Sequence, residues 1–225
     1  MTQEERAQEI LTILRRTFSL PDWATTPKKP FATLIRTVLS QATNDKNRDK
    51  AFKSLSEKFH ITPTVLSEAD VKAIEEAIRI GGLYRNKSRV IKELSRVIVE
   101  KFNGTLDFIY STSLEEARKL LMALPGIGPK TADVVLLFSA NKPVLPVDTH
   151  VNRVSKRLEL AASKADYERV RLTLQSLYSP NDYLAVHILL IMLGRKYCKA
   201  RHAMSLSKAR RLNCGNNKRS QAEPS

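Results

Sequence analysis

The chain has 225 residues, of which 42% are hydrophobic, and its 38 Lys and Arg against 23 Asp and Glu give a formal net charge of +15 at pH 7. This length and hydrophobic content exclude a disordered tail, and two cysteines exclude a disulfide-bonded scaffold. Seven glycines and ten prolines are few for an all-β protein. The basic excess indicates a polyanionic partner, with a merely soluble basic protein as the plain alternative.

No segment predicts export or membrane insertion. The N-terminus is polar and acidic, with no apolar run behind it. The longest apolar stretch, Leu184 to Leu193, has ten residues. Because a membrane-spanning helix needs about 20, we expect a soluble, intracellular protein that does not associate with a membrane.

The spacing of apolar residues predicts helices along the first half of the chain. Thr2 and Glu5 form the pattern of a capping box before the first helix, and Pro30 opens the second. A third helix is predicted over residues 44–59 and a fourth over 71–80. Gly81 and Gly82 stop the fourth, and a basic helix follows.

The second half of the chain continues in the same way. Ser113 is the predicted N-cap of a helix that runs to Met122. Further helices are predicted after Gly128 as far as Ala140, and over residues 149–158, 163–178 and 181–197. Since no segment alternates with a period of two, the predicted fold class is all-α.

The most specific local pattern is the string Leu124–Asp133, in which a Gly-x-Gly turn joins two helices. Gly126 and Gly128 permit a close approach of another backbone, and Ile127 between them can anchor the turn in the core. The N-terminus of the second helix suits one phosphate group, because its N–H groups point outward. The alternative is an ordinary helical hairpin that binds nothing.

This string resembles the helix-hairpin-helix motif of the endonuclease III family of DNA glycosylases. Four other stretches agree with that family in order and spacing: Leu39-Ser40-Gln41-Ala42-Thr43, Ile80-Gly81-Gly82-Leu83-Tyr84, Val147-Asp148-Thr149-His150 and Gly194-Arg195-Lys196-Tyr197-Cys198. The resemblance implies a two-lobed helix-hairpin-helix glycosylase fold with the DNA-binding cleft between the lobes. It places a six-helix lobe at 22–142 and a terminal lobe at 1–21 plus 143–214. The basic and polar composition of residues 215–225 predicts a disordered tail.

The resemblance also implies catalytic roles for Lys130 and Asp148. Lys130 falls in the first turn of a helix, where the helix dipole disfavours the ammonium form, and a neutral amine can form a Schiff base with a sugar carbon. Asp148 follows 18 residues later, and its carboxylate could accept a proton and stabilise a cationic sugar. The alternatives are that Lys130 only contacts a phosphate and that Asp148 only caps the helix at Thr149.

Further DNA contacts are predicted, two from the same resemblance and two from basic segments. Gln41 and Leu83 correspond to the two side chains with which the family fills the gap left by a flipped nucleotide. On residues alone, Leu83 is equally a hydrophobic contact at a helix end, and Gln41 an ordinary amide. Lys87 belongs to the basic run after Leu83 and is predicted to contact DNA, although a solvated helix face is the more common outcome for any such lysine. Lys199 is the first basic residue of a C-terminal arm with the same predicted role.

The chain departs from its relatives at the C-terminus. Many of them hold a [4Fe–4S] cluster with four cysteines, and Cys198 and Cys214 match the outer two positions. Ser205 and Lys208 occupy the inner two, and neither replaces a thiolate well. We therefore predict no cluster and no metal site. A Cys198–Cys214 disulfide is the less favoured possibility, because the intracellular environment is reducing.

These features together predict a bifunctional DNA glycosylase and AP lyase for base excision repair, which removes oxidised pyrimidines through a lysine Schiff base and β-elimination. The predicted partner is double-stranded DNA with a damaged base or an abasic site, bound by a monomer in the cytoplasm at the prokaryotic nucleoid. One alternative is a glycosylase for mismatched thymine or uracil, or for adenine opposite oxidised guanine. Another is a non-catalytic helix-hairpin-helix DNA-binding protein.

Overall fold

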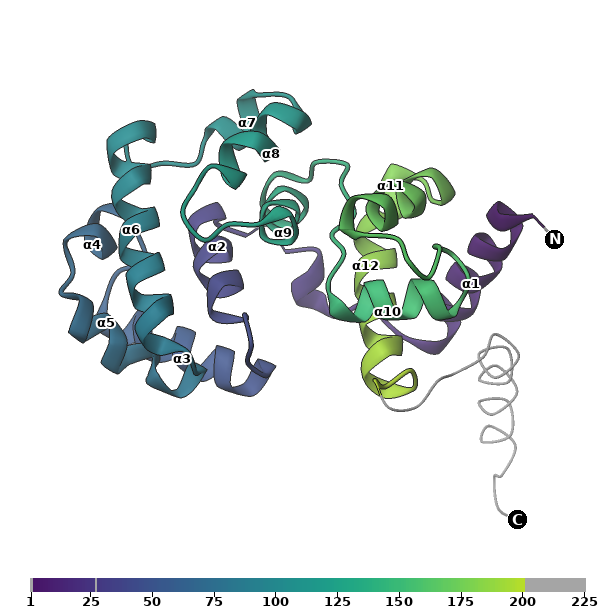
Figure 1. Ribbon diagram of the computed structural model, residues 1–225, viewed down its shortest axis with the longest axis horizontal. Helices are drawn as coiled ribbons and strands as arrows, with labels where there is room; N and C mark the ends of the chain where they lie inside the picture. Colours follow the sequence, from purple (N-terminus) through teal and green to yellow (C-terminus); the bar gives the residue numbers. More distant parts are fainter. Residues whose placement is uncertain (1, 27, 201–225) are drawn as a thin grey trace, which may run out of the picture. The chain divides into compact units, whose positions relative to one another are not determined.

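The computed structural model describes residues 2–26 and 28–200. This part of the chain folds into twelve α-helices and three short 3₁₀ turns and contains no strand, so the predicted all-α class is confirmed (Figure 1). None of its helices combines the length and the apolar character needed to cross a membrane. Contacts between residues divide the chain into two compact units, one of residues 27–142 and one of residues 1–26 with 143–225.

The unit of residues 27–142 is organised around α6. The helices of this unit are α2 (Pro30–Leu39), α3 (Asp45–Lys58), α4 (Pro63–Glu68), α5 (Val71–Ile78), α6 (Tyr84–Phe102), α7 (Phe108–Ser111), α8 (Leu114–Met122) and α9 (Pro129–Ala140). α4 and α5 both pack against α6, α2 packs against α9, and α8 packs against α9. Ile91, Leu94 and Ile98 of α6 are fully buried, as expected for a stripe at helical spacing.

The helix starts of this unit follow from side chains that the sequence already marks. Ser113 accepts a hydrogen bond from the Glu116 N–H, which confirms it as the N-cap of α8. Asn44 caps α3 by accepting from the Asn47 N–H. Such caps satisfy amides that have no partner within the helix.

Two short helices, α4 and α7, were not predicted. They have six and four residues, which is too short for an apolar period to be recognised. The predicted helix over residues 71–80 is also shorter in the structure, because α5 ends at Ile78 and a 3₁₀ turn, η2 (Arg79–Gly81), follows it.

The unit of residues 1–26 and 143–225 has α12 as its central helix. Its elements are α1 (Gln3–Thr17), η1 (Asp22–Ala24), α10 (Thr149–Arg157), α11 (Tyr167–Leu177), η3 (Pro180–Asp182) and α12 (Tyr183–Lys196). α12 packs against α1 and α10, and nine of its residues are buried. A helix that is buried on most of its faces belongs in a core.

In this unit the predicted start of α1 is confirmed, whereas the start of α11 differs from the prediction. The capping box of Thr2 and Glu5 is present at the start of α1, as predicted. α11 begins at Tyr167 rather than at residue 163, because Asp166 caps it by accepting from the Arg169 N–H.

Candidate functional site

The turn between α8 and α9 is held tightly against α6. Gly126 has a φ of +73°, and a Cβ placed on it would lie 2.6 Å from Cγ1 of Val90. Ile127 is 6% exposed, so its side chain anchors the turn in the core as predicted from the sequence. Any residue other than glycine at position 126 would therefore be strained in its backbone and would push the hairpin away from α6.

The first turn of α9 has the features of an anion site. Gly128 is its N-cap and Pro129 its first helical residue, and the Gly128 carbonyl accepts hydrogen bonds from the N–H groups of Thr131 and Ala132. A Cβ on Gly128 would meet no atom within 4 Å. The space in front of the helix start is thus open, and the partial positive charge of a helix N-terminus favours an anion there.

Lys130 is the second residue of α9 and is partly exposed. One turn further along the helix, the carboxylate of Asp133 is fully buried and accepts from Nε of Arg118 at 2.7 Å and from its Nη2 at 3.4 Å. This ion pair joins α8 to α9, so it fixes the helix that carries Lys130. Arg118 was not singled out from the sequence, and only its place opposite Asp133 in a helical hairpin could have indicated it.

Lys87 does not lie where the sequence led us to expect it. Its side chain is 2% exposed, and its ammonium donates to the carbonyl oxygen of Leu39 at 2.9 Å and to that of Gly81 at 2.8 Å. Burial lowers the pKa of this amine. An ammonium enclosed by two carbonyls is not exposed to a phosphate, so the geometry gives the predicted contact of Lys87 with DNA no support.

Gln41 and Leu83 are both exposed, each in a short turn. Gln41 follows the end of α2, and its N–H donates to the carbonyl of Val38. Leu83 is the N-cap of α6, with a left-handed backbone (φ 47°) and a side chain that is 61% exposed. A large apolar side chain displayed at the tip of a turn is free to contact a partner, and the Lys87 ammonium joins the bases of these two turns.

Asp148 is the N-cap of α10 in the other unit, where Oδ1 accepts from the Val151 N–H at 2.7 Å. The extended chain before it is held from several sides: Gln175 Oε1 accepts from the Leu145 N–H, and the Tyr167 hydroxyl oxygen accepts from the Val147 N–H. The ring of His187 lies 2.8 Å from the Pro146 carbonyl oxygen. The capping role is thus confirmed, and it holds the carboxylate at the start of α10.

Lys199 lies in a segment that two arginines of α10 hold. Arg157 donates to the carbonyls of Lys199 at 2.7 Å and of Ala200 at 2.9 Å, while Arg153 donates to the carbonyl of Cys198 at 3.0 Å. The side chain of Lys199 is exposed, and Cys198 is buried with Nη1 of Arg157 at 3.4 Å from its Sγ. Ser205, Lys208, Cys214 and the predicted tail at 215–225 lie outside the described residues.

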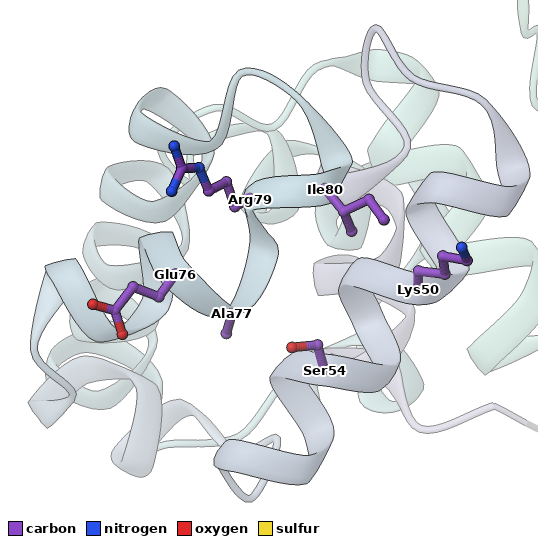
Figure 2. A pocket seen from close by; sticks show the side chains of 6 residues that line it. All are labelled: Lys50, Ser54, Glu76, Ala77, Arg79 and Ile80. Carbon is purple, nitrogen blue, oxygen red and sulfur yellow. The ribbon is translucent and has the colours of Figure 1, made fainter.

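A shallow hollow of about 510 Å³ lies between α3, α5 and η2 (Figure 2). Lys50 and Ser54 of α3 line it on one side and Glu76 and Arg79 on the other. None of the site residues predicted from the sequence lines this hollow. The exposed groups at the hairpin and the two turns are therefore the better candidate site.

Comparison with known proteins identifies a family whose sequences match this chain over most of its length. Residues 35–180 match the family described as HhH-GPD superfamily base excision DNA repair protein. Endonuclease III of Sulfolobus acidocaldarius is 40% identical over 172 residues, which are 76% of this chain and 75% of that protein. For endonuclease III of Thermotoga maritima the identity is 37% over 201 residues, 89% of this chain and 86% of that protein.

Solved structures of endonuclease III have a fold similar to that of this chain. A trapped covalent intermediate of endonuclease III with DNA has a TM-score of 0.78 at 33% identity, covering 91% of this chain and 92% of that one. A non-covalent complex of endonuclease III with DNA has a TM-score of 0.79 at the same identity, covering 91% of both chains.

The two glycines of the hairpin give a stability prediction. Gly126→Ala should lower the free energy of unfolding by about 2 kcal/mol or more, because it adds a left-handed alanine and a clash with Val90. Gly128→Ala is the matched control and should cost less than about 1 kcal/mol, since its backbone is extended and its surroundings are open. Val90→Ala added to Gly126→Ala should recover part of the loss. Urea unfolding measures all three, and equal losses for the two glycine variants would contradict the packing described above.

Proposed function

The chain belongs to the HhH-GPD superfamily of base excision DNA repair proteins, and from this premise we propose that it is a DNA glycosylase and AP lyase that removes oxidised pyrimidines from duplex DNA. The observation that carries this proposal is Lys130 in the first turn of α9, beside an open helix start suited to a phosphate. The protein acts as a monomer on the chromosomal DNA of a prokaryotic nucleoid.

Lys130 supplies the nucleophile. Its neutral amine attacks C1′ of the damaged nucleotide, the bond from C1′ to the base breaks, and the base leaves with the bonding electrons and takes up a proton. Opening of the sugar ring leaves an imine between Nζ and C1′. Loss of a proton from C2′ then breaks the bond from C3′ to the phosphate oxygen, and hydrolysis of the imine frees Lys130.

Asp148 supplies negative charge and a proton acceptor. Its carboxylate stabilises the cationic sugar while the base departs and accepts the proton that the amine loses on attack. Oδ1 caps the helix, which keeps the carboxylate in place, while the other oxygen can face the sugar.

The remaining site residues bind the duplex. The turn of Gly126, Ile127 and Gly128 receives one backbone phosphate at the start of α9, and Gln41 and Leu83 enter the space that the flipped nucleotide leaves. Lys199, exposed on a segment held by Arg157, contacts a further phosphate.

The chain works without an iron–sulfur cluster. A cubane cluster takes four thiolates, whereas the relevant positions offer Cys198, Ser205, Lys208 and Cys214. The donor set does not fit the group, since a lysine ammonium is no ligand and a serine is a poor one. Cys198 itself is buried against the guanidinium of Arg157, and no step of the proposed reaction involves a metal.

The Schiff base is tested by borohydride reduction. Incubated with duplex DNA that contains thymine glycol or an abasic site, the wild type should form a covalent adduct, and Lys130→Ala should form none because the imine nitrogen is missing. Lys101→Ala, which changes an exposed lysine at the end of α6, should trap like the wild type. A wild type that binds this DNA but never traps would exclude the lyase and favour a monofunctional glycosylase or a non-catalytic DNA-binding protein.

The two roles of Asp148 can be separated. Asp148→Asn keeps a good N-cap and should change the free energy of unfolding by only a few tenths of a kcal/mol, whereas Asp148→Ala should cost about 1 kcal/mol. Both should slow single-turnover base removal by about 10²- to 10⁴-fold, because both remove the carboxylate. Full base removal by the folded Asp148→Asn variant would show that Asp148 is a cap only.

Iron analysis tests the cluster. Protein purified without oxygen should carry far less than one iron atom per chain and show no visible absorption band, because two of the four ligand positions lack a thiolate. About four iron atoms per chain in protein of full activity would overturn the proposal.

A further inference from the structure

Lys87 has no role in the proposed chemistry, and yet it is among the largest fully buried side chains of the protein. Burial of an ammonium is costly, and such groups persist where their hydrogen bonds are needed. The two bonds at Leu39 and Gly81 reach across 48 and 6 residues of the chain respectively. They therefore join the end of α2 to the 3₁₀ turn that precedes α6.

The two carbonyls are the bases of the two turns that display Gln41 and Leu83. Leu39 is the last residue of α2, two positions before Gln41, and Gly81 is the last residue of η2, two positions before Leu83. The ammonium of Lys87 thus binds, in each turn, the carbonyl that lies two residues before the exposed side chain. Its second link to the Leu83 turn is its own backbone N–H, which donates to the Leu83 carbonyl at 3.0 Å.

Both turns also contain a non-glycine residue in the left-handed region. Ala42 has a φ of 50° and Leu83 a φ of 47°. Such residues are strained and persist only where surrounding contacts hold them. The bridge of Lys87 supplies such a contact to both turns at once.

We propose that Lys87 is a positioning residue, whose buried side chain sets the spacing of the Gln41 and Leu83 turns so that both side chains can enter the duplex together. The inference rests on the proposed function, because it takes Gln41 and Leu83 as the groups that fill the gap left by the flipped nucleotide. A neutral amine still has two N–H groups for the two carbonyls, so the bridge does not depend on the charge.

The test compares Lys87→Met with Lys92→Met. Lys92 is on the same helix and likewise donates to a carbonyl, that of Ala69 at 2.9 Å, away from the two turns. Lys87→Met should slow single-turnover removal of thymine glycol from duplex DNA by about 10- to 100-fold, the effect expected of a misplaced contact. It should cleave a single-stranded abasic oligonucleotide at the wild-type rate, because that substrate needs no gap filled. Lys92→Met should match the wild type on both substrates.

A spectroscopic readout separates positioning from general destabilisation. With 2-aminopurine opposite the lesion and protein at saturation, the fluorescence increase that reports unstacking should be reduced for Lys87→Met and kept for Lys92→Met. Lys87→Arg, which can still donate to both carbonyls, should restore most of the signal and of the duplex rate. It also serves as the test if Lys87→Met does not fold, in which case Lys87→Arg with neither signal nor duplex activity overturns the proposal.

Hydrogen exchange of the free protein tests the bridge between the two turns without relying on catalysis. In Lys87→Met, peptides over residues 40–44 and 80–84 should both exchange faster, while Lys92→Met leaves them unchanged. If the wild type cleaves neither substrate but this paired change is seen, the proposed function fails and the bridge stands. Equal loss of activity on single-stranded and duplex substrates, or exchange that changes in neither turn, overturns the role of Lys87.

Discussion

The arrangement of residues 27–142 depends on what the first two turns of α6 contact. Leu83 caps this helix, the Lys87 ammonium binds the carbonyls of Leu39 and Gly81, and Val90 meets the hairpin where Gly126 leaves no room for a side chain. One rigid helix therefore fixes three separate segments, which are the end of α2, the turn before α6 and the hairpin that leads to Lys130. Because these contacts are a buried ammonium and a close van der Waals approach, small changes in either are expected to shift functional groups that do not touch them.

In the other unit a candidate site residue also lies at the start of a helix. Asp148 caps α10, and the extended chain before it is held by Gln175, Tyr167 and His187, so the carboxylate is placed by side chains from two other helices. Lys130 likewise lies in the first turn of its helix, and Asp133 with Arg118 fixes that helix from the buried side. Functional side chains in general must be held within about 0.5 Å of their working position. Helix starts braced by buried polar contacts meet this need better than mobile loops do.

The sequence predicted the parts of the fold that local chemistry decides. The caps at Thr2 and Ser113, the glycine turn of the hairpin and the cap at Asp148 follow from side chains within three residues of the group they serve. It failed where a partner is distant in the chain: Lys87 is a basic residue between the exposed Arg85 and Arg89, and its partner Leu39 is 48 residues away. The pair of Arg118 and Asp133 was missed for the same reason. α4 and α7 were missed because a helix of four to six residues shows no apolar period.

The segment that follows α12 begins with Tyr197 and Cys198 and is held against α10. In the described residues this segment is held by side chains of α10. Arg153 and Arg157 of α10 donate three hydrogen bonds from planar guanidinium groups to its backbone carbonyls, at Cys198, Lys199 and Ala200, and Arg153 also donates to the carbonyl of Gly194 within α12. Charged donors of this kind make stronger hydrogen bonds than neutral ones, and α10 is the helix that Asp148 begins. The same helix therefore holds a candidate catalytic carboxylate at its start and, through its two arginines, the segment with Lys199.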